Sequence, residues 1–273
     1  MGAVTESPPL SVLTVAGSDP SGGAGIQADL MVFSHLGLHG ISVVTAITAQ
    51  NTRGVQAVFP LGKELVATQL ESVKSDFKPA AFKTGMLPTV DIIDELCSYI
   101  GDNRLGMLVV DPVLVSTSGS RLASKDCAPY LVDRLLPFCS LVTPNLFEAE
   151  VLSGRSIKTE ADAQEAARAL VDAGAAAACI TGGHWPGNPV DFLFDGQIMH
   201  KFEGRRIEGA RGQRATGEIH GTGCVFSAAA TGFLARGFSS ADAVANAKIL
   251  TERAISGAIS AGVGMKLPWL DKE

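Results

Sequence analysis

The chain has 273 residues, of which 46% are hydrophobic and 18% are charged, a balance typical of a globular protein with a sizeable core. Its net charge of −6 argues against a surface that binds the phosphate backbone of nucleic acids. Five widely spaced cysteines without a C-x-x-C pair indicate neither a disulfide framework nor a zinc site, and no stretch has the pattern of a signal peptide or the length of a membrane span, so we expect a cytoplasmic protein.

Short apolar runs alternate with helical patterns along the whole sequence. This alternation predicts an α/β fold of three layers, α/β/α, with a mostly parallel central sheet. We expect residues 1–10 to be a flexible segment and residues 11–273 to form a single domain, because no repeat or linker interrupts the alternation. The predicted strands are Ser11–Ala16, Ile41–Ala49, Ala81–Thr84, Met107–Val110, Leu141–Thr143 and Ala177–Thr181, followed by a hairpin of Asp191–Phe194 and Gln197–Phe202. The predicted helices are Gly25–Leu36, Lys63–Lys74, Val90–Ile100, Asp126–Leu136, Leu146–Ser153, Glu160–Ala173, Cys224–Arg236 and Ser240–Ala261.

A glycine-rich turn, residues 17–25, joins the first predicted strand to the first helix. Its end, residues 23–28, has the G-x-G-x-x-A form of a dinucleotide fingerprint. That fingerprint needs an acid about 20 residues further on to hold the ribose. No Asp or Glu occurs between Asp29 and Glu64, which excludes NAD. The turn still allows a small ligand to approach the backbone closely.

Asp29 falls inside the apolar stripe of the helix that follows this turn. At 100° per residue it projects between Leu36 and Phe33. A carboxylate in that position is costly to bury unless it is paired or faces a ligand. The sequence leaves both alternatives open.

Polar or adaptable residues follow three predicted strands, at the edge where parallel sheets bind ligands. Gln50 has the amide donor and acceptor that the edge of an aminopyrimidine requires, although it could instead cap its own loop. Met86 suits an adaptable apolar wall. Asp111 suits a metal site, and capping of the next turn is the alternative.

Asn145 and Glu148 support two interpretations. As the N-cap and the third residue of a helix they approximate a capping box, although the box proper has Ser or Thr at the cap. Alternatively, Glu148 holds Mg²⁺ directly or through water, because this ion prefers one or two carboxylates with waters and phosphates. The local pattern favours the capping box.

The most informative segment is Gly221-Thr222-Gly223-Cys224, which directly precedes an apolar helical run. A helix that begins behind glycines leaves backbone N–H groups unpaired and aimed at one point, where the helix dipole also favours negative charge. A phosphate suits this point, and the thiol of Cys224 lies at its rim. The structural alternative is a tight turn that uses glycine only for its conformation.

Six segments, taken together and in order, resemble the hydroxymethylpyrimidine/phosphomethylpyrimidine kinase family of thiamine biosynthesis, within the ribokinase-like superfamily. The resemblance covers essentially the whole chain and implies a ribokinase-like fold, a homodimer, and ATP and Mg²⁺ as cofactors. It also implies phosphorylation of 4-amino-5-hydroxymethyl-2-methylpyrimidine and then of its monophosphate. The segments that carry it are residues 16–30, 45–56, 85–87, 143–148, 182–184 and 220–224.

The resemblance also implies roles for individual residues. An anion hole would be formed by Gly221, Thr222, Gly223 and Cys224, with the cysteine in the place where most ribokinase-like enzymes have an aspartate base. A thiolate base there requires a lowered pKa. The pyrimidine pocket would comprise Gln50, Gly17, Asp29 and Met86, the Mg–ATP site Asn145, Thr181 and Gly183, and the metal site Glu148 and Asp111.

Two features depart from the family pattern. Many members have a lysine where this chain has Thr181, and the arginine-rich segment Ile207–Glu218, which overlaps the loop Gly204–Gly217, is longer than expected for the family. Two alternatives therefore accompany the kinase hypothesis: a pyridoxal kinase, since related enzymes share the Gly-Thr-Gly-Cys ending, and a catalytically silent ligand-binding protein on a kinase scaffold.

Overall fold

The computed structural model describes residues 8–102, 106–183, 185, 187–207 and 219–271. Most of the predicted flexible segment 1–10 lies outside the described residues. So do residues 208–218 of the arginine-rich segment and residue 184 of the Gly-Gly-His motif.

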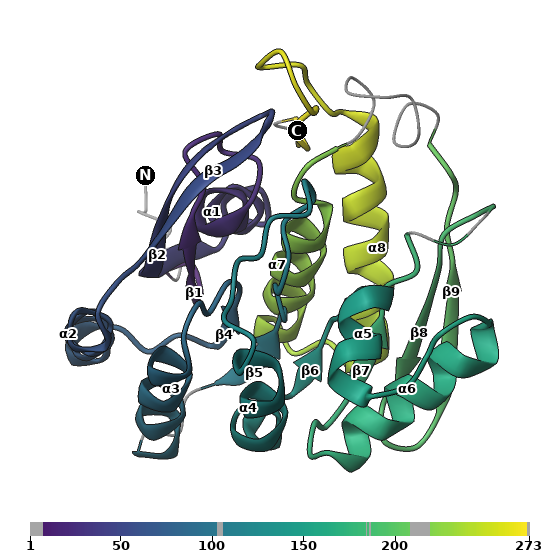
Figure 1. Cartoon of the computed structure of the whole chain (residues 1–273), viewed down its shortest axis with the longest axis horizontal. Coiled ribbons are helices and arrows are strands. Elements are labelled where there is room, and N and C mark those ends of the chain that lie inside the picture. Colours follow the sequence, from purple (N-terminus) through teal and green to yellow (C-terminus); the bar gives the residue numbers. More distant parts are fainter. Residues whose placement is uncertain (1–7, 103–105, 184, 186, 208–218, 272–273) are drawn as a thin grey trace, which may run out of the picture.

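One sheet of nine strands, in the order β3-β2-β1-β4-β5-β6-β7-β8-β9, forms the centre of the described structure (Figure 1). Neighbouring strands from β2 to β7 run parallel, whereas β3 at one edge and the β8–β9 hairpin at the other are antiparallel. The prediction of a mostly parallel sheet between two helical layers is confirmed.

The elements follow the predicted order closely. The strands are β1 (Ser11–Ser18), β2 (His39–Asn51), β3 (Gly54–Pro60), β4 (Ala81–Thr84), β5 (Met107–Val110), β6 (Leu141–Val142), β7 (Ala178–Ile180), β8 (Val190–Phe194) and β9 (Met199–Glu203). The helices are α1 (Gly25–His35), α2 (Lys63–Asp76), α3 (Val90–Asp102), α4 (Cys127–Arg134), α5 (Leu146–Ser153), α6 (Glu160–Asp172), α7 (Thr222–Ala235) and α8 (Ser240–Ser256), with a 3₁₀ turn at Leu136–Phe138.

The main differences from the predictions are one additional strand and the ends of two helices. Strand β3 was not predicted, because a short edge strand bounded by Gly54 and Pro60 gives a weak sequence signal. Helix α4 ends before the predicted Leu136, where Pro137 cannot continue an α-helix. Helix α8 ends at Ser256 rather than at Ala261, directly before Gly257.

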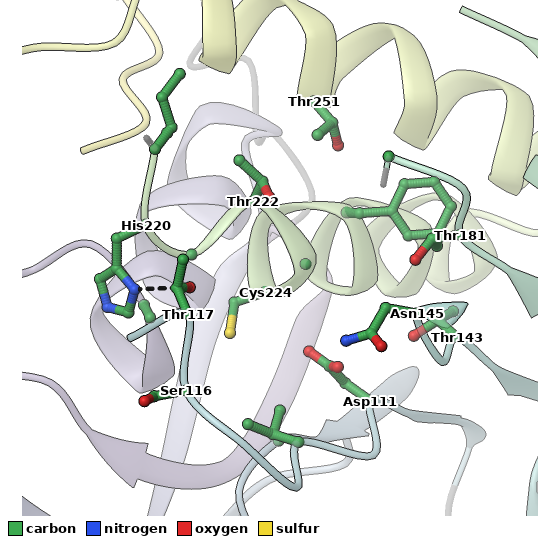
Figure 2. A pocket seen from close by; sticks show the side chains of 18 of the residues that line it. Asp111, Ser116, Thr117, Thr143, Asn145, Thr181, His220, Thr222, Cys224 and Thr251 are labelled. Atoms are coloured by element: carbon green, nitrogen blue, oxygen red, sulfur yellow. Dashed lines mark hydrogen bonds between the residues drawn. The ribbon is translucent and has the colours of Figure 1, made fainter. Parts of the chain in front are cut away.

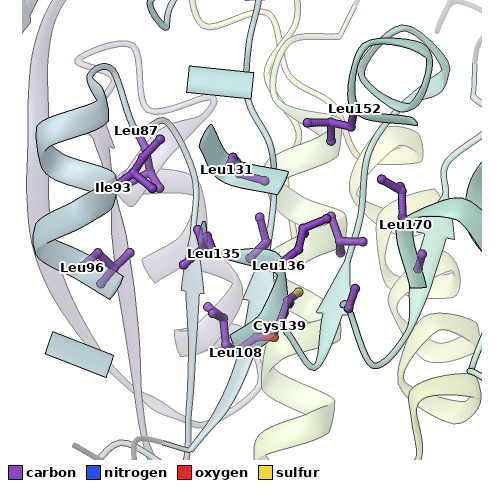
Figure 3. Close-up of a cluster of buried hydrophobic side chains, with 14 of the residues drawn as sticks. Leu87, Ile93, Leu96, Leu108, Leu131, Leu135, Leu136, Cys139, Leu152 and Leu170 are labelled. Atoms are coloured by element: carbon purple, nitrogen blue, oxygen red, sulfur yellow. Dashed lines mark hydrogen bonds between the residues drawn. The ribbon is translucent and has the colours of Figure 1, made fainter. Parts of the chain in front are cut away.

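Two hydrophobic clusters hold the layers together. The larger cluster lies between the sheet and helices α2 to α6, and Figure 3 shows its leucines meeting from helices and strands. The second cluster packs α1, α7 and α8 on the opposite face. Helix α7 is apolar almost all round because it lies between α1, α8 and the sheet. Among the described residues, no helix has the length and apolar character needed to cross a bilayer.

The parallel register places the carboxyl ends of β1, β4, β5, β6 and β7 along one edge of the sheet. The amino end of α7 reaches the same edge: Gly221 and Cys224 line a common cavity with Gly17, Met86 and Asp111. The fold therefore collects at one edge the segments that the sequence had marked separately.

Candidate active site

A cavity of about 800 Å³ opens at this edge of the sheet. Figure 2 shows Asp111, Asn145 and Cys224 around the space below the start of α7. The cavity is lined by every predicted site residue except Asp29, namely Gly17, Gln50, Met86, Asp111, Asn145, Glu148, Thr181, Gly183, Gly221, Thr222, Gly223 and Cys224.

The anion loop, Gly221 to Cys224, is held in place by a backbone contact that only glycine permits. Gly221 has φ +88°, and a Cβ atom there would lie 1.8 Å from the carbonyl oxygen of Gly23. Helix α7 begins directly behind it without a side-chain cap, and the N–H of Val225 makes the first helical bond to Gly221. The N–H groups of the first turn therefore face the cavity without a capping side chain, as an anion site requires.

Asp29 does not line the cavity, which corrects its predicted contact with substrate. Its carboxylate is fully buried and accepts hydrogen bonds from Lys83 Nζ at 2.8 Å and Thr14 Oγ1 at 2.6 Å. Of the two alternatives that the sequence left open for Asp29, the structure contains the first: the carboxylate is paired within the fold. Burial raises the pKa of Asp29, and the charge of Lys83 and these two hydrogen bonds oppose that rise.

Lys83 connects Asp29 to the cavity. Its ammonium group also lies 3.6 Å from Asp111 Oδ2, which lines the cavity and accepts a hydrogen bond from Ser227. Burial by itself would lower the pKa of Lys83, but the charges of Asp29 and Asp111 outweigh it and raise that pKa. The ammonium group of Lys83 therefore joins two carboxylates, one fully buried and one at the cavity wall.

The side chain of Cys224 is half-buried in the wall of the cavity. Burial, followed by the charge of Asp111, raises the pKa of its thiol to about 12, although the charge of Lys83 and the N–H of Gly25 oppose this. The lowered pKa that a thiolate base requires is not found. The thiol nevertheless lies at the rim of the anion loop, as the sequence predicted.

Asn145 and Glu148 form the capping box, and both also line the cavity. The Glu148 N–H donates to Asn145 Oδ1 at 3.0 Å, and the Asn145 N–H donates to Glu148 Oε2 at 3.0 Å. Burial and the charge of Asp111 raise the pKa of Glu148 to about 8. Two carboxylates that disfavour each other's charge are a donor set that a divalent cation would satisfy.

No group of three or more His, Cys, Asp or Glu side chains within the described part of the chain forms a closed metal centre. Asp111 and Glu148, which line the same cavity, offer the one or two carboxylates that an ion such as Mg²⁺ takes from a protein, with waters and substrate phosphates completing its coordination.

The end of the cavity away from Asn145 and Glu148 is lined by apolar groups and by the side-chain amide of Gln50. Met86 packs on Gly17, where a Cβ atom would lie 2.6 Å from the methionine Cε. The Gln50 Nε2 atom lies 2.8 Å from His220 Nε2, which is also 2.9 Å from Asp19 Oδ2. Burial would raise the pKa of Asp19, but hydrogen bonds from His220 and Ser21 outweigh burial and lower it.

Sequence reasoning assigned no role to Lys83, to the Asp19–His220 pair, or to Lys248 on α8. The Nζ of Lys248 lies 2.7 Å from Asp191 Oδ2, and both residues line the cavity. A lysine within the apolar strand β4 indicates a buried carboxylate partner, and Asp29, in the apolar stripe of its helix, needs a partner of opposite charge if it is buried. His220 lies 201 positions from its partner Asp19, and Lys248 lies 57 positions from Asp191. Pairs so far apart in the chain leave no local signal in the sequence.

The sequence profile of the phosphomethylpyrimidine kinase family matches residues 19–268. The chain belongs to this family. A hydroxymethylpyrimidine/phosphomethylpyrimidine kinase of Rhizobium meliloti is 44% identical over 255 residues, which cover 92% of each chain. The thiamine biosynthesis bifunctional protein of Geobacter sulfurreducens is also 44% identical, over 93% of this chain. The chain spans about half the length of that relative, since the match covers 51% of it.

Solved structures of two kinds are similar to this member of the phosphomethylpyrimidine kinase family. The phosphomethylpyrimidine kinase of Clostridium difficile 630 is 38% identical with a TM-score of 0.78, over 90% of this chain and 99% of that one. The pyridoxal kinase of Bacillus subtilis in its ADP complex is 37% identical with a TM-score of 0.84, over 95% and 97%. The ribokinase-like fold implied by the sequence resemblance is thus confirmed.

Proposed function

We propose that the protein transfers the γ-phosphoryl group of ATP to the hydroxymethyl group of 4-amino-5-hydroxymethyl-2-methylpyrimidine, and then to the resulting monophosphate, in thiamine biosynthesis. The observation that carries the proposal is the position of the uncapped start of α7, between a carboxylate pair and an amide-lined apolar pocket. Family membership supports the same reaction.

The residues divide into three groups. Asn145, Thr181 and Gly183 would bind the nucleotide, and Asp111 with Glu148 would hold Mg²⁺, which neutralises charge on the transferred phosphoryl group when bound. The N–H groups of Gly221 to Cys224 would stabilise that charge from the opposite side. Gln50 and Met86, with Gly17, would bind the pyrimidine ring. As the family resemblance implies, we propose a homodimer, and we place it in the cytoplasm.

A coupled assay of ADP release over three acceptors tests the function: hydroxymethylpyrimidine, its monophosphate and pyridoxal, each with and without Mg²⁺. We expect turnover of both pyrimidines that depends on Mg²⁺. Turnover of no acceptor would support the alternative of a catalytically silent binding protein and overturn the proposal. Turnover of hydroxymethylpyrimidine, together with no turnover of its monophosphate, would overturn only the proposed second phosphorylation.

Pyridoxal phosphorylation is the second candidate function. The structural similarity to the Bacillus subtilis pyridoxal kinase, over nearly the full length of both chains, favours it. A clear preference of kcat/KM for pyridoxal over hydroxymethylpyrimidine in the same assay would make it the first candidate.

Replacing Gln50 by alanine is expected to raise the KM for the pyrimidine roughly tenfold, because the substitution removes about one hydrogen bond and leaves the ligand amine unpaired. Steady-state kinetics with the pyrimidine as the varied substrate measures this. The control is Gln56→Ala on strand β3, whose side chain bonds the backbone of its own hairpin and does not line the cavity. Equal KM values in the two variants would mean that Gln50 only shapes its loop.

Cys224→Ala is expected to lower kcat less than about a hundredfold, at the bottom of the range for general-base catalysis. The reason is that its surroundings raise the pKa of the thiol, so that positioning and the anion loop carry most of the rate. Single-turnover kinetics with saturating ATP measures the effect. A loss of 10³-fold or more would instead identify the thiol as the base in the complex with both substrates.

A further inference from the structure

The segment between β7 and β8 contributes Thr181, Gly183 and Pro189 to the lining of the cavity. Its first residues are fixed by backbone contacts: the N–H of Gly182 donates to Asp191 Oδ1 at 2.8 Å, and a Cβ atom on Gly182 would lie 1.8 Å from the carbonyl oxygen of Val190. Three carbonyl groups further along, those of Gly183, Trp185 and Gly187, accept hydrogen bonds from a side chain that comes later in the sequence.

Arg206 supplies that partner from a distant part of the chain. Its guanidinium donates from Nη1 to the carbonyl oxygen of Gly183 at 3.2 Å, from Nη2 to that of Trp185 at 2.6 Å and from Nε to that of Gly187 at 2.5 Å. Its own N–H donates to Asn188 Oδ1 at 3.3 Å. Arg206 thus binds three residues through its side chain and a fourth through its backbone, in a segment that it follows by about twenty positions. We call this set of contacts the Arg206 clamp.

The chemistry of the clamp is specific to arginine. A guanidinium presents five N–H donors in a rigid plane, so three of its nitrogens can each reach a different carbonyl group. A lysine ammonium carries its donors on a single nitrogen and cannot span carbonyl groups spread over five residues. Charge alone therefore does not reproduce these contacts.

The clamped segment belongs to the end of the cavity with Asn145 and Thr181. The N–H of Thr181 donates to the carbonyl oxygen of Pro144 at 2.9 Å, and Thr181 forms a β-bridge with Asn145. Gly183 lines the cavity beside them, and so does Arg206. Gln50 lies on β2 and Met86 follows the end of β4, and both strands are separated from β7 by β5 and β6 in the sheet order.

We propose that Arg206 is a positioning residue for the nucleotide: it holds the carbonyl groups of Gly183, Trp185 and Gly187 in the arrangement that binds ATP, and it does not act on the pyrimidine. This proposal rests on the proposed function only because it takes ATP to be the bound nucleotide. If the unclamped segment adopts the binding conformation for about a tenth of the time, nucleotide affinity falls about tenfold.

Three variants test the clamp. Arg206→Ala removes it, Arg206→Lys keeps the charge without the planar fork, and Arg134→Ala removes an exposed arginine that pairs with Asp94 outside the cavity. Titration calorimetry with ADP as the probe, and hydrogen exchange of residues 181–189 in the free protein, are measured with steady-state kinetics. Circular dichroism verifies that each variant is folded.

We expect Arg206→Ala and Arg206→Lys to weaken ADP binding and raise the KM for ATP roughly tenfold, with the KM for the pyrimidine and kcat changed less than about twofold. Exchange in residues 181–189 should accelerate in both variants, and Arg134→Ala should match the unmodified protein. Three results would overturn the proposal: unchanged ADP affinity in Arg206→Ala, normal ADP affinity in Arg206→Lys, or an equal rise of the KM values for ATP and the pyrimidine. If the unmodified protein phosphorylates no acceptor while Arg206→Ala still loses ADP affinity, the clamp stands and the proposed function fails.

Discussion

Replacing Lys83 by methionine is expected to lower the free energy of unfolding by about 3–5 kcal/mol, because the buried carboxylate of Asp29 is left without its counter-ion. Both side chains of the pair are 0% exposed, so water cannot replace the lost contact. Urea denaturation at neutral pH measures the change. The matched control is Lys74→Met, which breaks an ion pair whose side chains are 42% and 63% exposed and should cost less than about 1 kcal/mol.

The pH dependence of the Lys83→Met variant gives an independent check. Burial already raises the pKa of Asp29, and loss of the lysine charge removes the main opposition to that rise. A carboxyl group whose pKa is higher in the folded state than in the unfolded state binds protons preferentially when folded, so stability falls as the pH rises above its unfolded value. The deficit should therefore be smallest in acid and largest near neutral pH.

Adding Asp29→Leu to Lys83→Met should recover most of the lost stability, because replacing both members of a buried pair is far less costly than removing one. Equal effects of Lys83→Met and Lys74→Met would contradict the assignment of Asp29 as the buried partner.

Gly221→Ala is expected to lower kcat/KM by about 10²–10³-fold, the range for loss of a preorganised donor in a transition-state site. The alanine methyl group would meet the carbonyl oxygen of Gly23 at 1.8 Å, and the backbone would be held at a φ of +88° that alanine disfavours. The anion loop must therefore move away from the turn that supports it, and a displacement of about 1 Å can cost a hundredfold in rate. Steady-state kinetics with the best acceptor measures the effect.

Gly101→Ala in α3 is the control for this substitution. No heavy atom lies within 4 Å of a Cβ atom at that position, and Gly101 does not line the cavity. Its kinetics should match those of the unmodified protein. A Gly221→Ala variant with the same kinetics as Gly101→Ala would show that the position of the anion loop does not limit the reaction.

The fold was predictable because its signals are local. Apolar runs and helical periodicity marked the parallel strands and the helices in order, and the Asp195-Gly196 turn marked the β8–β9 hairpin. The errors occurred where local signals are weak: an edge strand, β3, and two helix ends. Strand order in the sheet was not predicted, since it depends on contacts between segments far apart in the chain.

The candidate site was predictable to the extent that its residues follow strands or begin helices. Asn145 and Glu148 show the limit of this reasoning. The sequence favoured a capping box over a position at the ligand site, whereas in the structure the two residues form the capping box and also line the cavity. Cys224 shows it again: its place beside the anion loop could be predicted, but its raised pKa depends on burial and on Asp111, more than a hundred residues away.

The sequence alone therefore determined the alternating α/β architecture, the glycine loop that begins α7, and the family to which the chain belongs, since each is written in neighbouring residues or ordered motifs. Only the tertiary structure decided that Asp29 pairs with Lys83 instead of facing the cavity, that the surroundings of Cys224 raise the pKa of its thiol, and that Arg206 contacts the segment after β7. The physical reason is common to all three. Ion pairing, burial and hydrogen bonding between distant segments depend on distances in space, which spacing along the chain does not specify.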